Sequence, residues 1–357
     1  MQKLSQLLKL AATVLATAAL VACGGGGSST DTTGAGTGQT GTGGTSDTGT
    51  GSAGGGSNDS GSSTVPTGTT QASPTYVAGS AEAQIFTSIN ALRQQCGFPA
   101  YQQNTILDQA AASHAKYMVA NGGTVTDEEV KGNPGFTGVT GQDRANALGW
   151  PSAVFATAAD AGLWTSEALT PAQYGQSLVD QWSVGVYHQA TITLQAGLIG
   201  VGTAQTSSNG LTGILGGVEL ATNGVAASPI TSASNAPLTF PCQGVTGLPY
   251  KSVSEEPTPP NVSSDGWGTP VTVMGNVGDV VTLSSATMIA AGDATVIAMN
   301  IVTSANDTTG LIATAQAVAY PASPLQPNTS YSVNLTGTIN GVAFTRSFTF
   351  TTGNTIA

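Results

Sequence analysis

The side chains that could carry out chemistry in this chain are few, and only two of them are imidazoles. His114 and His188 are the two histidines among 357 residues, so a Ser/His/Asp triad or an imidazole-bound metal would have to use one of them. The sequence has neither the Gly-x-Ser-x-Gly turn that exposes a nucleophilic serine nor a phosphate-binding Gly-Lys-Ser/Thr loop. Nucleophilic catalysis and phosphoryl transfer therefore find little support.

The two histidines differ in their surroundings. His114 shares helical spacing with Leu107 and Met118, which favours a core histidine that hydrogen-bonds the backbone of a neighbouring loop over a ligand. For His188, a structural role in orienting a following strand and a ligand-facing role are equally compatible with the pattern.

Charge excludes one class of partner. Lys and Arg number 8 against 19 Asp and Glu, which gives a net charge of −11, and the basic residues are scattered singly. Because phosphate backbones are bound by basic patches, we expect no nucleic-acid partner.

The N-terminus has the pattern of a lipoprotein signal peptide, residues 1–22. The apolar run from Leu10 to Val21 is shorter than the roughly 20 residues that span a bilayer, as in a signal-peptide core. The sequence LVAC at residues 20–23 resembles a bacterial lipobox, in which Cys23 becomes the lipid-bearing N-terminus. Since Gly24 rather than Asp follows, the resemblance implies a bacterial outer-membrane location with a lipid anchor as the membrane partner. An ordinary signal peptide with a chance cysteine is the alternative.

Residues 23–77 are rich in Gly, Ser and Thr, a composition that predicts a disordered tether. Residues 78–225 predict helices followed by strands, an α+β arrangement. Strands are expected at residues 197–205 and 213–220. The expected helices begin at four capping residues, Ser80, Asn104, Thr140 and Thr170.

The C-terminal part predicts a second, all-β region. Residues 226–261 form a Pro-rich connector, and residues 262–357 contain six short β-type runs separated by turn signals. Asn340-Gly341 predicts a hairpin between the last two runs. The end of the chain resembles bacterial Ig-like sandwich modules, which implies a spacer or adhesive role.

A set of short motifs in residues 78–225 carries a family resemblance. In order they are Asn90-x-x-Arg93, Leu107-x-x-Ala110-Ala111-x-x-His114-Ala115, Gly135-Phe136-Thr137-Gly138, Asp143-Arg144-Ala145, Ser166-Glu167, Trp182-x-x-x-Val186-Tyr187-His188 and Ile199-Gly200-Val201-Gly202. Together they resemble the CAP superfamily (cysteine-rich secretory proteins, antigen 5, pathogenesis-related proteins) in its bacterial SCP-like branch. The resemblance implies an α-β-α sandwich whose cleft is lined by two histidines and two acidic residues.

The family cleft is only partly present in this sequence. The resemblance places His188 at the second cleft histidine, Glu167 at the glutamate of the family's Gly-Glu-Asn motif, and Asp180 as the nearest acidic candidate for the fourth position. The first histidine has no counterpart, because residues 126–129 read Thr-Asp-Glu-Glu, with Asp127 at this point of the chain. Glu167 in a structural hydrogen-bonding role and Asp127 in a solvated acidic loop are the alternatives.

No cofactor is certain from these residues. The family cleft implies a candidate divalent metal held by Glu167 and His188. One imidazole among up to three carboxylates favours Ca, Mg or Mn over the Zn commonly proposed for the family.

Two functions from different classes follow. The leading hypothesis is a non-enzymatic binding module at the cell envelope, with a lipid, glycan or peptide in the CAP cleft. The alternative is a divalent-metal-dependent hydrolase that uses Glu167 and His188 on envelope or host polymers. A structural envelope protein without a ligand is a third interpretation.

The remaining cysteines predict a disulfide. With Cys23 acylated, export leaves Cys96 and Cys242 in an oxidising compartment, where spare thiols pair. The alternative is that Cys96, at helical spacing from Leu92 and Ile89, is a buried free thiol.

Overall fold

The computed structural model describes residues 64–222 and 235–357. The lipobox with Cys23, and most of the expected tether, lie outside these residues. All described residues, in the helical region and in the C-terminal strands, belong to one compact unit. Within the described part of the chain, no helix is both long enough and apolar enough to cross a membrane.

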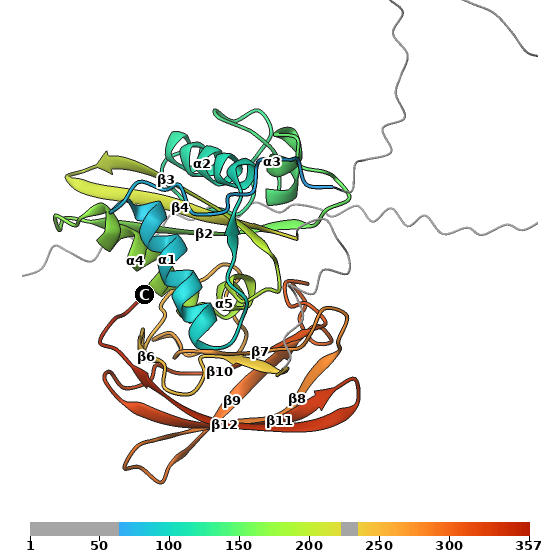
Figure 1. The fold of residues 1–357 in the computed structure, drawn as a ribbon. Helices are drawn as coiled ribbons and strands as arrows, with labels where there is room; N and C mark the ends of the chain where they lie inside the picture. Colours follow the sequence, from blue (N-terminus) through green and yellow to red (C-terminus); the bar gives the residue numbers. More distant parts are fainter. Residues whose placement is uncertain (1–63, 223–234) are drawn as a thin grey trace, which may run out of the picture. The chain divides into compact units, whose positions relative to one another are not determined.

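The N-terminal region is a four-stranded sheet covered by helices on both faces (Figure 1). The strand order is β1-β3-β4-β2, with β1 parallel to β3 and the other pairs antiparallel. Helices α2 and α3 lie over one face, and α1 and α4 over the other. The bounds are α1 Ala81–Gln95, β1 Gln102–Gln103, α2 Thr105–Ala120, α3 Gly141–Ala147, β2 Ala156–Thr165, α4 Pro171–Val184, α5 Val186–Ile192, β3 Leu198–Ser208 and β4 Leu211–Ala221.

All four expected helix starts are confirmed. The side chains of Ser80 and Asn104 accept hydrogen bonds from backbone N–H groups in the first turns of α1 and α2. Thr140 and Thr170 form complete capping boxes with Asp143 and Gln173. These caps satisfy N–H groups that a helix start leaves unpaired.

Helix α2 sits unusually close to strand β3. A side-chain carbon at Gly200 would overlap the backbone of Leu107, and one at Gly202 would overlap the backbone of Ala112. The Gly-Val-Gly alternation therefore lets α2 lie directly on the strand. This contact fixes the position of His114, which lies on α2.

The C-terminal region is a β-sandwich. Eight strands run in the order β5-β7-β10-β9-β8-β11-β12-β6, and the two halves of this order enclose one apolar core that includes Val273, Val333 and Phe350. The Asn340-Gly341 hairpin is confirmed, with both residues at positive φ. The bounds are β5 Leu238–Phe240, β6 Thr246–Leu248, β7 Val271–Met274, β8 Val281–Ala290, β9 Val296–Thr303, β10 Gln316–Pro321, β11 Ser330–Ile339 and β12 Val342–Thr352.

The expected connector takes part in the sandwich, since β5 and β6 fall within residues 226–261. The two regions also share buried polar contacts. The side chain of Gln189 donates to the carbonyls of Ser183 (2.8 Å) and Pro270 (3.1 Å), and it accepts from the backbone N–H and the hydroxyl of Thr272 (3.0 and 2.8 Å). A buried amide with all its partners satisfied holds one arrangement of the two regions.

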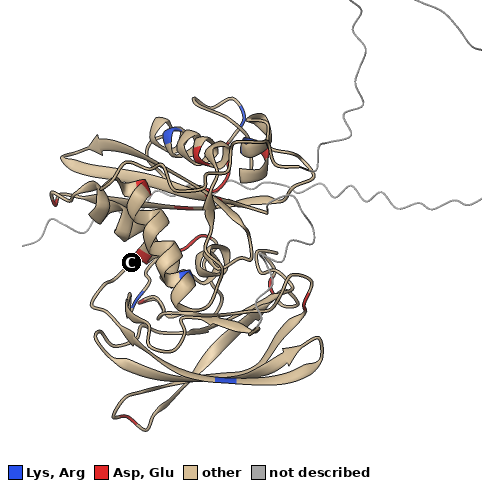
Figure 2. Cartoon of the chain, in the orientation of Figure 1, with Lys and Arg blue, Asp and Glu red and all other residues tan. Residues whose placement is uncertain are grey.

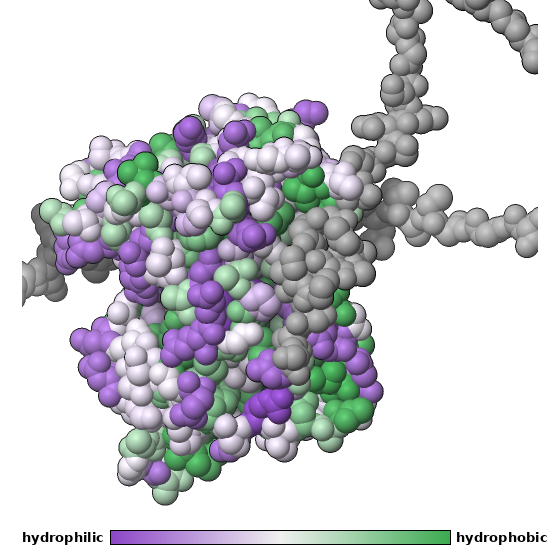
Figure 3. All heavy atoms as spheres, in the orientation of Figure 1, coloured by the Kyte–Doolittle hydropathy of each residue, from purple (hydrophilic) through white to green (hydrophobic). Residues whose placement is uncertain are grey.

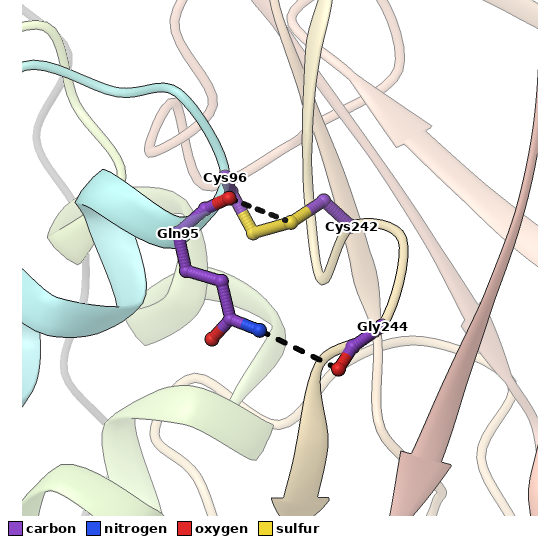
Figure 4. The surroundings of a disulfide bond; sticks show 4 residues. All are labelled: Gln95, Cys96, Cys242 and Gly244. Carbon is purple, nitrogen blue, oxygen red and sulfur yellow. Dashed lines mark hydrogen bonds between the residues drawn. A yellow bond between two sulfur atoms is a disulfide. The ribbon is translucent and has the colours of Figure 1, made fainter.

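The predicted disulfide is confirmed. Cys96, directly after α1, is bonded to Cys242, with their Cα atoms 5.4 Å apart (Figure 4). Beside it the side chain of Gln95 donates to the carbonyl of Gly244 at 3.4 Å. Cys96 also lies in the core of the sandwich, so the covalent bond joins α1 to the C-terminal region.

Breaking this disulfide is expected to lower stability substantially. It closes a sequence separation of 146 residues, and the chain-entropy model gives such a loop about 5 kcal/mol as an upper value. We expect a Cys96→Ala/Cys242→Ala variant to unfold at lower denaturant concentration than the wild type, measured by circular dichroism. Equal unfolding midpoints for the two proteins would show that the bond contributes nothing. Alkylation of the unreduced wild-type protein should label neither thiol.

Candidate functional site

Charged side chains are sparse over the chain (Figure 2), and apolar and hydrophilic residues are interspersed on the face in Figure 3. A place where acidic groups gather is therefore a candidate functional site. They gather in a pocket of about 590 Å³ at the edge of β2. Its wall is formed by the loop at 125–127, residues 160–163 of β2, residues 177 and 180–182 of α4, His188 of α5, and two C-terminal segments, 253–256 and 355–357.

The carboxylate of Glu255 holds the start of α5 and His188. Its oxygens accept from the backbone N–H groups of Val186, Tyr187 and His188 at 2.6, 2.9 and 2.8 Å, and the Nδ1 of His188 lies 2.7 Å away. The preceding residue, Gly185, offers no side-chain cap to α5. A side chain at Gly185 would collide with the Glu255 carboxylate, so glycine makes room for a cap from a distant segment.

His188 is favoured in its protonated form. Burial lowers the pKa of its imidazole. This effect is outweighed by the hydrogen bond and charge of Glu255, the charge of Asp127 and a hydrogen bond to the backbone carbonyl of Asp160. Together they raise the pKa above the usual 6.5. Two acceptors facing one imidazole suit two N–H donors. His188 and Glu255 therefore form an ion pair in the pocket wall.

Three aspartates share the pocket with this pair. Asp127 is an exposed residue, but partial burial of its carboxyl raises its pKa, although the charges of His188, His114 and Arg144 act in the opposite direction. Burial raises the pKa of Asp180, whose Oδ1 accepts from Gln176 at 2.8 Å. Burial raises the pKa of Asp160 well above its ordinary value. These carboxyls are poorly compensated by positive charge.

Behind the pocket lies a second polar cluster. Nε2 of His114 lies 2.6 Å from the carbonyl of Thr126, and Nδ1 lies 3.0 Å from Glu129. The expectation that His114 is a core histidine bonded to the backbone of a neighbouring loop is confirmed. Arg144 pairs with Glu219 at 3.0 Å in the same buried layer, so this cluster ties α2 and α3 to β4 and the 126–129 loop.

The N-terminal region matches a known protein family. A model of the CAP, cysteine-rich secretory protein family matches residues 86–213. These residues are a CAP domain. No curated protein sequence matches the chain. Glu255 lies beyond the matched range, so His188 is held by a residue from outside the CAP domain.

The structure brings some of the expected cleft residues together and leaves one apart. His188, Asp127 and Asp180 all line the pocket of the CAP domain. Glu167 is exposed in the segment between β2 and α4 and does not line it. His188 lies inside helix α5, and the strand expected at residues 197–205 follows it as β3.

Sequence reasoning missed three acidic groups of this pocket, Asp160, Glu255 and Glu256. Asp160 lies within β2, a strand that was not predicted. Glu255 lies in the Pro-rich connector, where its only signal was the adjacent acidic pair Glu255-Glu256.

The candidate divalent metal does not fit the residues present. Its two expected ligands are apart, because Glu167 is outside the pocket, and the Nδ1 of His188 is taken by Glu255. Across residues 64–222 and 235–357, no three His, Cys, Asp or Glu side chains are grouped as a metal site would require.

Replacing Glu255 by glutamine is expected to lower the pKa of His188, because the amide keeps a hydrogen-bond acceptor but loses the negative charge. We also expect a loss of about 1–3 kcal/mol in stability. The pKa can be measured by NMR titration, with His114 as the internal reference, since these are the chain's two histidines.

In the wild type the pair stabilises fully below pH 6.5, and this contribution declines as the pH rises through the raised pKa of His188. Glu255→Gln should remove that pH dependence. Identical His188 titration curves in both proteins would contradict the ion pair.

Proposed function

We propose that this protein is an exported, lipid-anchored binding module of the bacterial outer membrane, whose CAP cleft receives a lipid, glycan or peptide ligand. The observation that carries this proposal is the pocket of about 590 Å³ beside His188. Its volume falls in the range of small-molecule sites, and it combines apolar walls with a few polar groups.

The C-terminal sandwich supports a role in recognition beyond that of a spacer. Two of its neighbouring segments, 253–256 and 355–357, form part of the pocket wall. They pair with one another, since the N–H of Val253 donates to the carbonyl of Ala357 at 3.0 Å. Its antiparallel strands and hairpin are compatible with an Ig-like module. In this proposal the sandwich and the CAP domain bind the ligand together.

The hydrolase alternative has less support. It requires Glu167 and His188 to act on one substrate, and only His188 lines the pocket. The binding function needs no such pair.

Filling the pocket is expected to abolish ligand retention. Ser177 on α4 lines the pocket and is half-buried, so Ser177→Phe would occupy part of its volume. Native mass spectrometry of full-length protein, extracted from membranes in mild detergent, should show a bound mass in the wild type and its loss in this variant. Ser207→Phe, at an exposed position of β3, is the matched control. A bound mass that persists in Ser177→Phe would place the ligand elsewhere.

The anchor has its own test. Cys23→Ser removes the thiol that would carry the lipid, and two or three acyl chains are what make such anchoring stable. We expect the variant to move from the membrane fraction to the soluble fraction of the same cells. Palmitate labelling should be lost in parallel. Retention of the variant in the membrane fraction would contradict lipid anchoring at Cys23.

A further inference from the structure

The pocket wall is strongly unbalanced in charge. Five acidic side chains line it, and no Lys or Arg does. The one imidazole, His188, is already paired with Glu255. Four carboxyl groups therefore remain without a basic residue in the wall: Asp127, Asp160, Asp180 and Glu256.

A second observation points to a ligand that donates hydrogen bonds. Asp160 is only 3% exposed, and its Oδ2 accepts no hydrogen bond. This oxygen lies 3.5 Å from Nε2 of His114, the same nitrogen that contacts the carbonyl of Thr126. Thr126 and Asp160 both belong to the pocket wall, and His114 does not line the pocket, so Oδ2 faces the layer directly behind the wall. Leaving a buried carboxylate oxygen unpaired costs free energy that an incoming donor would recover.

Part of the remaining wall is apolar. Val125, Val253 and Ile356 line the pocket and are 41%, 56% and 51% exposed, and Leu163 lines the same pocket. Exposed apolar side chains beside uncompensated carboxylates suit a ligand with a cationic donor on an apolar chain.

We propose that the pocket binds an organic ammonium ligand, a primary amine carried on a short apolar chain. This inference rests on the proposed binding function and names the ligand chemistry of the same pocket. The ammonium donates to the acidic groups around Asp160, and the chain lies against Val253 and Ile356.

The affinity for such a ligand should rise with pH. The groups facing the pocket are the carboxyls of Asp127, Asp160, Asp180, Glu255 and Glu256 and the imidazole of His188. Behind the wall lie His114, Glu129, Arg144 and Glu219. As the pH rises, carboxyls with raised pKa values become charged and His188 loses its proton. A primary amine stays protonated to about pH 10. Both changes make the pocket more negative, so both strengthen the binding of a cationic ligand.

The test compares three probes that share one apolar chain. Hexylamine, 1-hexanol and hexanoate are titrated into the full chain by isothermal calorimetry, with the NMR signal of His188 as a second readout. We expect hexylamine to bind at least about tenfold more tightly than hexanol, and hexanoate to bind most weakly. Hexylamine affinity should increase between pH 5 and pH 8.

Matched variants assign the effect to the acidic wall. Asp180→Asn and Asp127→Asn should each weaken hexylamine binding, by up to about tenfold, without changing hexanol binding. Glu128→Gln, next to Asp127 but outside the wall, should change neither. Using two isosteric variants keeps the test decisive if one of them fails to fold.

Equal affinity for hexylamine and hexanol, or a preference for hexanoate, would overturn the inference. So would hexylamine binding that is unchanged in both aspartate variants. Equal affinities for hexylamine and hexanol, with the binding of both lost in Ser177→Phe, would leave the proposed function standing while the ammonium preference fails. If none of the three probes binds, the inference fails, and the native mass spectrum still decides the proposed function independently.

Discussion

The carboxylate of Glu255 is the constraint on which the site depends. It is fully removed from solvent and receives three backbone N–H groups and one imidazole. A buried carboxylate is tolerated only when donors and positive charge surround it, and the first turn of α5 with His188 supplies both. The same contact sets the orientation of His188 and holds the 253–256 segment against the CAP domain. The pocket wall follows from these two placements.

The parts of the fold that could be predicted from sequence are those with local causes. Helix starts at Ser80 and Thr170 are fixed by a capping side chain within three residues, and the hairpin at Asn340-Gly341 by two residues at positive φ. Strand β2 could not be predicted in this way. Its sequence from 156 to 165 is rich in alanine, which has little strand preference, and it becomes a strand because it pairs along its whole length with β4.

The candidate site follows the same division. His188, Asp127 and Asp180 were found because short motifs place them near one another in a known fold. Asp160 and Glu255 depend on packing between residues far apart in the chain, which no local pattern encodes. For Glu167 the local pattern was misleading. Its Ser-Glu pair matches the family motif, but the chain between β2 and α4 leaves Glu167 exposed.

The Cys96–Cys242 bond also changes how this protein would respond to mechanical load. A pull along the chain between α1 and the C-terminal strands is carried by the covalent bond rather than by residues 97–241. At about 3.5 Å for each extended residue, roughly 500 Å of chain is thereby shielded from stretching. The strands beyond Cys242 and the segment before Cys96, which includes α1, would bear the force, while the part of the CAP domain after Cys96 is shielded from it.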